Sequence, residues 1–303
     1  MSNELKENAN VDIANTEPTY LADKNAHPRD KDMQFVESTH KYTILPDPDS
    51  KYDSVTTWNH SHFSHFNAAL IIKNMMKGKN WNPENKYWGM TAEEIKKKWS
   101  QDGLKAASLG TALHYAIECF MNIEEKKVDE EPTNQMVCNF DNLVYTSAEW
   151  SYFLEFIKAF PHLKPYRTEW RVYDEDIKLA GSIDMVYENE DGTLSIYDWK
   201  RCKEISKTSA FKKHAKTACI NYIPDTNFWH YSLQLNTYKA ILERKYGKII
   251  KDLYLVQLHE ENPRKTFELI KCADLSNEID KLFELKKRTS INNSINQEND
   301  VIS

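Results

Sequence analysis

Two acidic residues and a lysine stand close together in the stretch from Leu179 to Lys203. Asp184 lies within an apolar run, and Asp198 is followed two residues later by Lys200. Carboxylate oxygens are the ligands that hard divalent cations prefer, and an ammonium group beside them can stabilise developing negative charge. The alternative is a structural salt bridge at a sheet edge, which is the commoner role of an Asp-x-Lys triplet. Residues elsewhere in the chain are needed to distinguish a metal site from a structural salt bridge.

The same stretch has the pattern of a β-hairpin. A tight-turn signal, Asp191-Gly192, separates two strand-like segments, 181–187 and 194–200. Such a turn suits residues that adopt positive φ angles. Because side chains alternate along a strand, the acid and the lysine of the second segment share one face. The hairpin therefore predicts two carboxylates on paired strands, with a lysine beside one of them.

A predicted helix upstream, GLKAASLGTALHYAIECFMN, carries a second set of candidate ligands. Gly110, His114 and Glu118 are four residues apart and form one stripe beside the apolar core face. A lone histidine on such a stripe is usually structural, but its place before an acid-bearing sheet favours a ligand. Glu169, near the start of a predicted strand over 168–173, is a weaker candidate.

The chain becomes basic directly after the hairpin. The cationic residues of this basic run are Arg201, Lys203, Lys207, Lys212, Lys213 and Lys216. A charge run is usually a solvated face. Here it adjoins an acid pair in a chain of net charge −6, which favours a local groove for a polyanion. Ser54 and Thr56 stand at a predicted helix start, where free backbone N–H groups can hold a phosphate.

Composition excludes several classes of protein. The 303 residues suffice for one large or two small domains. No run approaches the ~20 apolar residues that span a bilayer, and the polar N-terminus has no signal-peptide core, so we expect a soluble, intracellular protein without membrane contact. The five cysteines include no C-x-x-C pair, which argues against an iron–sulfur cluster. Seven glycines and no P-loop motif argue against ATP as a cofactor.

The order of predicted elements defines the fold class. From residue 104 it is helix, a further helix, three strands, helix and strand, which is αβββαβ without the extra helix. Gln234 and Tyr238 are four apart on the last of these helices. We therefore expect an α/β (α+β) protein with a mixed sheet flanked by helices. The predicted divisions are a disordered polar arm over 1–32, an N-terminal hairpin and helical extension over 33–103, a core over 104–289, and a disordered tail over 290–303.

With its motifs in this order, the chain resembles the PD-(D/E)xK nuclease superfamily in its RecB-like branch, which has a restriction-endonuclease-like core. The matching motifs are GTALH with Glu118, GSID, DWK and QLNTY. The resemblance covers roughly residues 104–260. The segment SVTTWNHSHF is also similar to the N-terminal segment of the mitochondrial genome maintenance exonuclease and its viral and phage relatives. Ile183 stands where the superfamily name has proline, and the cluster-binding cysteines of some relatives are absent.

The resemblance implies a Mg²⁺ or Mn²⁺ site and a DNA substrate. The implied metal ligands are His114, Asp184, Asp198 and the main-chain carbonyl of Trp199. Glu118 would hold a second metal ion through water. Lys200 would position the attacking water or stabilise the transition state. Gln234 and Tyr238 would contact the DNA backbone or buttress the site, and the basic run with Ser54 and Thr56 would hold DNA.

Three functions compete at this point. The first is a metal-dependent exonuclease that acts on single-stranded ends or flaps in DNA repair, recombination or replication. The second is a structure-specific or site-specific endonuclease on the same fold. The third is a catalytically silent nucleic-acid-binding module, which has no use for a carboxylate pair that repels phosphate. The motifs do not separate exonuclease from endonuclease, or DNA from RNA as the substrate.

Overall fold

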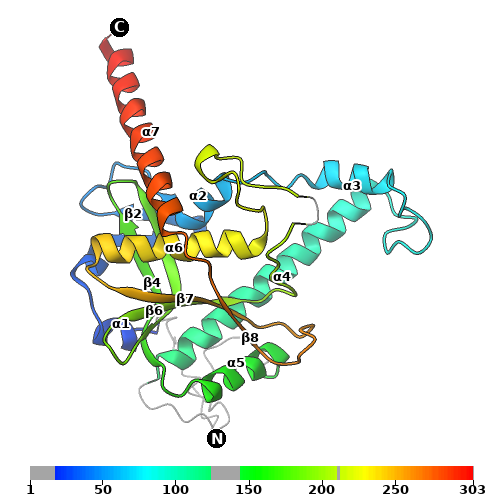
Figure 1. The fold of residues 1–303 in the computed structure, drawn as a ribbon, viewed down its shortest axis with the longest axis horizontal. Helices are drawn as coiled ribbons and strands as arrows, with labels where there is room; N and C mark the ends of the chain where they lie inside the picture. The colour runs from blue at the N-terminus through cyan, green and yellow to red at the C-terminus, as the bar shows by residue number, and fades with distance from the viewer. Residues whose placement is uncertain (1–17, 124–143, 210–211, 303) are drawn as a thin grey trace, which may run out of the picture.

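The computed structural model describes residues 18–123, 144–209 and 212–302. A sheet lies at the centre of the molecule, with helices on both sides (Figure 1). An arm formed by α3 (Ala68–Met76) and the N-terminal half of α4 (Ala92–Met121) projects to one side, and α7 (Ser276–Ile302) projects from the top (Figure 1). Residues 1–17, which belong to the predicted polar arm, lie outside the described residues.

The central sheet is mixed and is built around the predicted hairpin. Its strands in the described part of the chain are β3 (Asp53–Ser54), β4 (Lys164–Asp174), β5 (Leu179–Glu188), β6 (Leu194–Lys200), β7 (Ile250–Gln257) and β8 (Glu268–Lys271). β5 is antiparallel to β4 and to β6, β7 is parallel to β6, and β8 is antiparallel to β7. Gly192 has φ 77° in the hairpin turn, as the Asp-Gly signal predicts. β6 lies between β5 and β7 over residues 194–197, whereas Asp198 to Lys200 pair with β7 alone. A structural salt bridge between Asp198 and Lys200 therefore stays an alternative to a catalytic role.

One edge of β5 is shared between two partner strands. Residues Met185–Glu188 pair with β6, whereas Leu179 and Ala180 pair in parallel with β3. The four residues 181–184 lie between these two pairings. The last residues of β6, from Asp198 onward, continue beside β7 alone. The sheet therefore opens beside Asp184, and this opening positions the site described below.

Helices cover both faces of the sheet. α6 (Asn227–Lys245) and α7 (Ser276–Ile302) pack on one face, and α4 (Ala92–Met121) and α5 (Ala148–Ala159) pack on the other. The alternation of β6 explains this layering. Ile196 joins the α6 cluster, while Trp199 packs its ring 5.5 Å from Phe153 of α5. The order α4, β4, β5, β6, α6, β7, with α5 as the extra helix, confirms the predicted αβββαβ core.

The N-terminal extension begins with the predicted hairpin, β1 (Met33–Val36) and β2 (Lys41–Ile44), and continues through α2 (Val55–Ser61) and α3 (Ala68–Met76). α4 starts at a capping box in which the hydroxyl of Thr91 accepts from the backbone N–H of Glu94. This helix runs without interruption to Met121. The predicted boundary between residues 103 and 104 therefore falls inside α4, which belongs to both the extension and the core.

Residues 18–32 are ordered, so the prediction of a disordered arm was wrong for this segment. It contains α1 (Tyr20–Lys24) and the 3₁₀ helix η1 (Pro28–Asp32). Asp30 accepts hydrogen bonds from Arg167 (2.7 Å) and from the indole N–H of Trp170 (3.0 Å). These partners are 137 and 140 residues away in the sequence. Local composition carries no trace of such contacts, which is why the polar segment looked unstructured.

α7 continues to Ile302 in the structure, whereas disorder was predicted from residue 290 onward, and that part of the division stays a prediction. No glycine or proline interrupts residues 276–302, so nothing in this segment stops the helix. None of the helices in the described part of the chain is long and apolar enough to cross a membrane.

Candidate metal and nucleic-acid site

The opening of the sheet brings three potential metal ligands together. Single ligand atoms of His114, Glu169 and Asp184 all lie within 4.8 Å of one another. They come from α4, β4 and β5, which converge where the pairing of β5 changes partner. The predicted ligands His114 and Asp184 are therefore adjacent. Glu169, which the sequence ranked as a weaker candidate, completes the cluster.

The imidazole of His114 connects α4 to the end of β6. Its Nε2 donates to the carbonyl of Trp199 at 2.9 Å, because a carbonyl can only accept. Its Nδ1 lies 3.4 Å from Oδ2 of Asp184, which also accepts from the backbone N–H of Trp199 at 3.1 Å. In a neutral imidazole, Nδ1 then presents a lone pair to a carboxylate. A proton or a metal ion between these two atoms removes the repulsion.

Asp198 and Lys200 form a buried ion pair on the α6 side of the sheet. The ammonium nitrogen lies 2.5 Å from Oδ2 of Asp198, and the two side chains are 17% and 4% exposed. The ammonium also lies 4.6 Å from the centre of the Tyr231 ring, a contact that sequence reasoning missed. Lys200 is therefore held between a carboxylate and an aromatic face. Asp198 faces this lysine and is not one of the three clustered ligands.

Burial governs the protonation of the pair. It raises the pKa of the Asp198 carboxyl to about 6, helped by the negative charge of Asp184 and opposed by Lys200. Burial alone would lower the pKa of Lys200, but the attraction of Asp198 and Asp184 outweighs it and raises that pKa above its usual value. The lysine therefore stays charged at neutral pH, and a positive charge sits beneath the opening of the sheet.

Glu169 is held in an unusual conformation. Its φ is +41°, a left-handed value inside a strand, and its Oε2 accepts from the hydroxyl of Ser182 at 2.7 Å. Burial and the charge of Asp184 raise the pKa of this carboxyl to about 7. The charge of Glu118, one turn after His114 on α4, acts in the same direction. Glu118 therefore lies near the cluster, as the four-residue stripe on the helix predicts.

Tyr238 of α6 packs directly against β5. It is 3% exposed, and a side-chain carbon on Gly181 would meet its hydroxyl oxygen at 2.8 Å. Gly181 is therefore required by this close approach. The burial of Tyr238 favours the expected buttressing role and is incompatible with direct contact to DNA. Gln234, one turn earlier, donates to the hydroxyl of Thr56 at 3.3 Å and so connects α6 to the start of α2.

The predicted hydroxyl pair at the start of α2 is partly occupied within the protein. The hydroxyl of Ser54 caps this helix by accepting from the backbone N–H of Thr57 at 3.1 Å. Thr56 receives the hydrogen bond from Gln234. The structure thus brings Ser54, Thr56 and Gln234 to one place beside the beginning of β5. Their role in holding DNA stays a prediction.

The basic run does not behave as one surface. Arg201 forms a mostly buried ion pair with Glu149 at 2.9 Å, so burial excludes it from free contact with DNA. Lys203 pairs with Glu261 at 2.5 Å on the surface. The ammonium group of Lys207 lies 4.6 Å from the ring centre of Phe228. The three remaining lysines, Lys212, Lys213 and Lys216, are exposed.

The residues of the opening fit a divalent cation. His114, Asp184 and Glu169 offer one nitrogen and two carboxylates, and the carbonyl of Trp199 lies beside the histidine. This mixed nitrogen and oxygen set suits Mg²⁺ less than an all-oxygen set does and suits Mn²⁺ well. Oδ2 of Asp198 is buried and faces the ammonium group of Lys200. Two clustered carboxylates and a third buried one need positive charge nearby, which a metal ion would supply.

The αβββαβ core, with its opening at the acid-bearing strands, is the restriction-endonuclease-like fold of metal-dependent nucleases. The comparison with protein families agrees. The family model of the PD-(D/E)XK nuclease superfamily matches residues 86–299, and the chain belongs to this superfamily. The match begins within the arm and extends into α7, so it covers the whole sheet except β3. No curated protein matches the chain.

Proposed function

We propose that this protein is a Mg²⁺- or Mn²⁺-dependent deoxyribonuclease that removes nucleotides from single-stranded DNA ends or flaps. The observation that carries the proposal is the opening of the sheet beside Asp184. There a three-residue ligand cluster and a buried, charged lysine approach the same space from different elements. Membership of the superfamily supports hydrolysis of DNA as the reaction.

The side chains have distinct proposed roles. His114, Asp184 and the carbonyl of Trp199 would hold the metal ion, and Asp198 would complete the set after reorienting away from Lys200. Glu169 or Glu118 would bind a second ion directly or through water. A bound ion lowers the pKa of a water molecule and neutralises charge on the scissile phosphate. Lys200 would orient that water or donate to a phosphate oxygen.

The protein offers two places for the DNA backbone close to the opening. Ser54, Thr56 and Gln234 lie at one side of it, at the junction of α2 and α6. The exposed lysines Lys207, Lys212, Lys213 and Lys216 belong to the segment between β6 and α6. Local positive charge on an acidic protein is what a polyanion requires. A single strand that passes both places would present its phosphates to the ligand cluster.

The test uses end-labelled single- and double-stranded oligonucleotides with Mg²⁺, Mn²⁺ or EDTA. We expect metal-dependent cleavage that starts at a free end and gives a ladder of short products, with single strands preferred. A closed circular single strand should resist cleavage. If the circular strand is cleaved as fast as the linear strand, the protein is an endonuclease and the exonuclease proposal is wrong. Binding without cleavage in either metal would leave only a nucleic-acid-binding module.

A further inference from the structure

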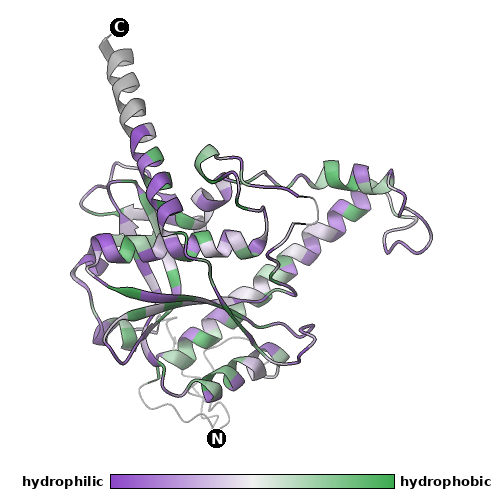
Figure 2. Cartoon of the chain, in the orientation of Figure 1, coloured by the Kyte–Doolittle hydropathy of each residue, from purple (hydrophilic) through white to green (hydrophobic). Residues whose placement is uncertain are grey.

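The arm is a small structural unit outside the catalytic core. It comprises residues 66–109, which include α3 and the first half of α4, and it projects from the body (Figure 1). Ile72, Tyr87 and Ile95 form a buried cluster of their own, around which Met76 and Met90 pack. Figure 2 shows hydrophobic residues on α3 apart from those of the central sheet. The arm is therefore a preformed unit held by its own core.

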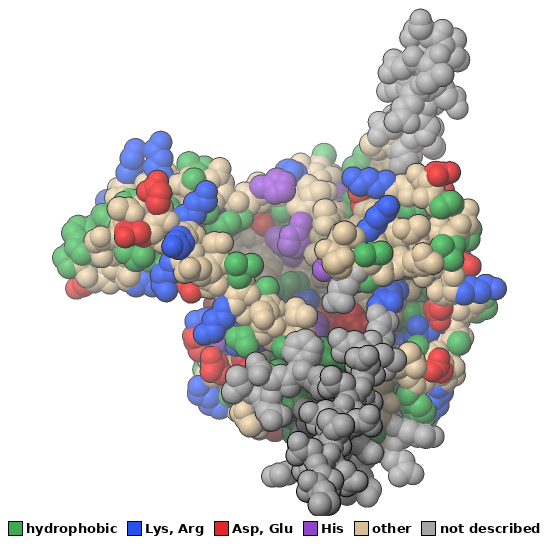
Figure 3. Space-filling view, turned by 180° about the vertical axis from the view of Figure 1, so that it is seen from behind, with side chains coloured by type: hydrophobic (Ala, Val, Ile, Leu, Met, Phe, Trp, Pro, Cys, Tyr) green, Lys and Arg blue, Asp and Glu red, His purple; other side chains and the backbone are tan. Residues whose placement is uncertain are grey.

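The middle of α4, which joins the arm to the body, is exposed to solvent. Residues 100–109 of α4 are exposed without exception, between Ile95, which is buried in the arm, and Ala112, which is buried in the body. Figure 3 shows a hollow between the arm and the body, in which histidine and acidic side chains are visible. The exposed helix thus connects the arm to the region of the ligand cluster.

The arm is positively charged in an acidic protein. It contains eight lysines, no arginine and four acidic residues, which gives a net charge of +4. Since the whole chain carries −6, the rest of the chain carries −10. The eight lysines, all exposed, are Lys73, Lys77, Lys79, Lys86, Lys96, Lys97, Lys98 and Lys105. Such a concentration of one sign on a projection is expected where a polyanion binds.

Exposed aromatic rings accompany the lysines. Phe66 is 73% exposed and Trp88 is 48% exposed, and the Trp88 ring lies 5.7 Å from that of Trp81. Aromatic faces interleaved with cations are the usual means of holding a single strand, because every base can stack on them. An apolar protein partner would explain the rings but not the surplus of lysines. Charge complementarity therefore favours nucleic acid as the occupant.

The helix geometry relates the arm to the site. Lys96 precedes His114 by 18 residues, which is five turns of 3.6 residues, so the two side chains leave α4 on the same face. Their separation along the axis is roughly 27 Å at 1.5 Å per residue. The positions between them on this face, Ser100, Gly103, Ala107 and Gly110, carry no bulky side chain. A strand along this face meets no obstacle from α4 itself.

We propose that the arm is a second DNA-holding surface, along which the strand that leaves the metal site runs over α4 to the arm lysines and Trp88. The proposal rests on the proposed nuclease function for the identity of the ligand. The distance of roughly 27 Å corresponds to about 8 phosphates of a stacked strand at ~3.4 Å spacing and to about half as many of a fully extended strand. An oligonucleotide of about four nucleotides or fewer cannot occupy the ligand cluster and the arm together. The arm therefore confers a dependence on substrate length.

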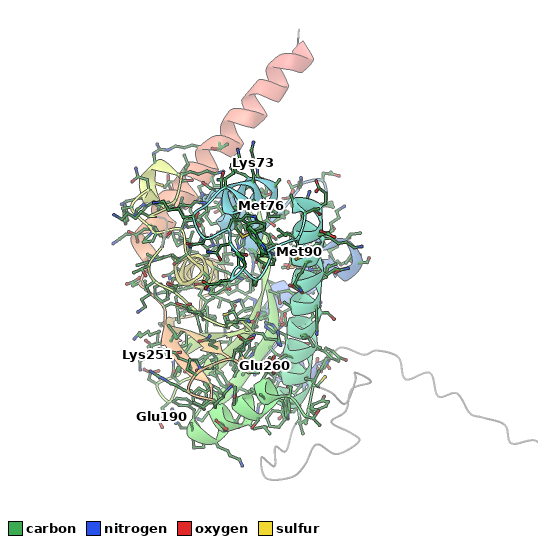
Figure 4. All side chains as sticks on the ribbon, turned by 90° about the vertical axis from the view of Figure 1, so that its right-hand side faces the viewer. Lys73, Met76, Met90, Glu190, Lys251 and Glu260 are labelled. Carbon is green, nitrogen blue, oxygen red and sulfur yellow. The ribbon has the colours of Figure 1, made fainter. Side chains whose placement is uncertain are left out.

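The test compares two pairs of substitutions that each remove two positive charges. The arm pair is Lys73→Gln with Lys96→Gln. The control pair is Lys251→Gln with Lys271→Gln, on β7 and β8, and Lys251 lies in the lower part of the body, away from Lys73 (Figure 4). Binding of single strands of about 4 and about 30 nucleotides is measured in EDTA over a series of salt concentrations.

We expect the arm pair to weaken binding of the long strand by about fivefold or more and to lower its salt slope by about 1.4, since each lost contact removes ~0.7. Binding and metal-dependent cleavage of the short strand should be unchanged, and the control pair should alter neither length. An equal loss for both lengths, or no loss for either, would overturn the proposal. So would a change in oligomeric state caused by the arm pair, which would mark the arm as an interface between two copies.

A second substitution examines the stacking component. Trp88→Ala should weaken binding of the long strand at least fivefold, whereas Trp88→Phe should retain most of it because an aromatic face remains. Melting curves of both variants check that the arm cluster stays folded. Equal affinity of the alanine variant and the wild type would show that Trp88 does not belong to the DNA-holding surface. Cleavage of the short strand by the wild type tests the nuclease function separately, because that substrate does not reach the arm.

Discussion

The ammonium nitrogen of Lys200 lies 2.5 Å from the carboxylate of Asp198, and the two side chains are largely buried where β6 pairs with β7 alone. This burial changes what a substitution measures. Removal of one member of a buried ion pair costs about 3–5 kcal/mol of stability, because the other charge is left unpaired. A loss of stability alone therefore does not separate a structural role of Lys200 from a catalytic one.

A double-mutant cycle separates them. Lys200→Met and Asp198→Asn should each lower the melting temperature, and the double variant should recover much of the loss, since no unpaired charge remains. Cleavage should stay at least ~10²-fold below wild type in all three variants, because we propose that Asp198 binds the metal ion and that Lys200 acts on the reacting phosphate. Single-turnover rates beside melting curves give the result. Wild-type turnover in the double variant would show that Lys200 and Asp198 have only a structural role.

The acids of the hairpin offer a matched comparison. Asp184→Asn preserves a hydrogen-bond acceptor for the backbone N–H of Trp199 but removes the charge of a metal ligand. We expect cleavage to fall below ~10⁻² of wild type with little change in melting temperature. Asp191→Asn, in the exposed turn of the same hairpin, should leave cleavage intact. Isothermal titration with Mn²⁺ should show weakened binding for the first variant alone. Wild-type metal affinity of Asp184→Asn would contradict the assignment.

The acid cluster predicts how stability depends on pH without metal. Burial raises the pKa of Asp198 to about 6 and that of Glu169 to about 7. Unfolded carboxyls titrate near ~4, so the folded state holds more protons between these values. The free energy of unfolding contributed by these groups therefore falls as pH rises through this window.

His62 contributes with the opposite sign, because burial lowers its pKa to about 4. The useful quantity is therefore the difference between the wild type and Glu169→Gln, followed by thermal melting. We expect Glu169→Gln to be the more stable of the two at about pH 8 and the gap to close near about pH 5. Mn²⁺ should raise the melting temperature of the wild type more at the higher pH, because metal and protons compete for the same carboxylates. A pH-independent difference would contradict this account.

Gly181 and Gly103 should respond oppositely to alanine. At Gly181 a new side-chain carbon meets the buried ring of Tyr238, which must shift, at a cost of about 1–3 kcal/mol. Cleavage should also decrease, because Asp184 is three residues further along the same strand. At Gly103, within the exposed part of α4, the space is open and alanine should stabilise by about 0.5–1 kcal/mol. Denaturant unfolding of both variants tests this, and a neutral Gly181→Ala would show that Tyr238 does not support β5.

Local signals in the sequence were sufficient for much of the fold. The hairpin around Asp191-Gly192 and the order of the core elements depend on neighbouring residues, and both are present. The predicted helix began at Gly103, but α4 continues through this glycine from Ala92, because one glycine costs a 30-residue helix too little to break it. The order of residues 18–32 depends on partners such as Arg167, which no local pattern reveals.

The site was predictable only as a set of residue types. Spacing placed His114 and Glu118 on one stripe, and the structure confirms that both lie near the acids. The prominence of Glu169 could not be foreseen, because ordinary strand alternation does not predict a left-handed residue. The contact of Tyr231 with Lys200 joins α6 to β6 across 31 positions and likewise left no signal.

The backbone of Glu169 has a consequence for how this protein would evolve. A non-glycine residue at φ +41° costs of the order of 1 kcal/mol, and its buried carboxyl costs more when ionised. Selection for heat resistance alone would therefore replace Glu169 with glycine or asparagine, and the replacement would spread in a library screened only for folding. A library screened for survival on DNA turnover would keep the glutamate. The two selections would diverge at this single position before they diverged elsewhere in the sheet.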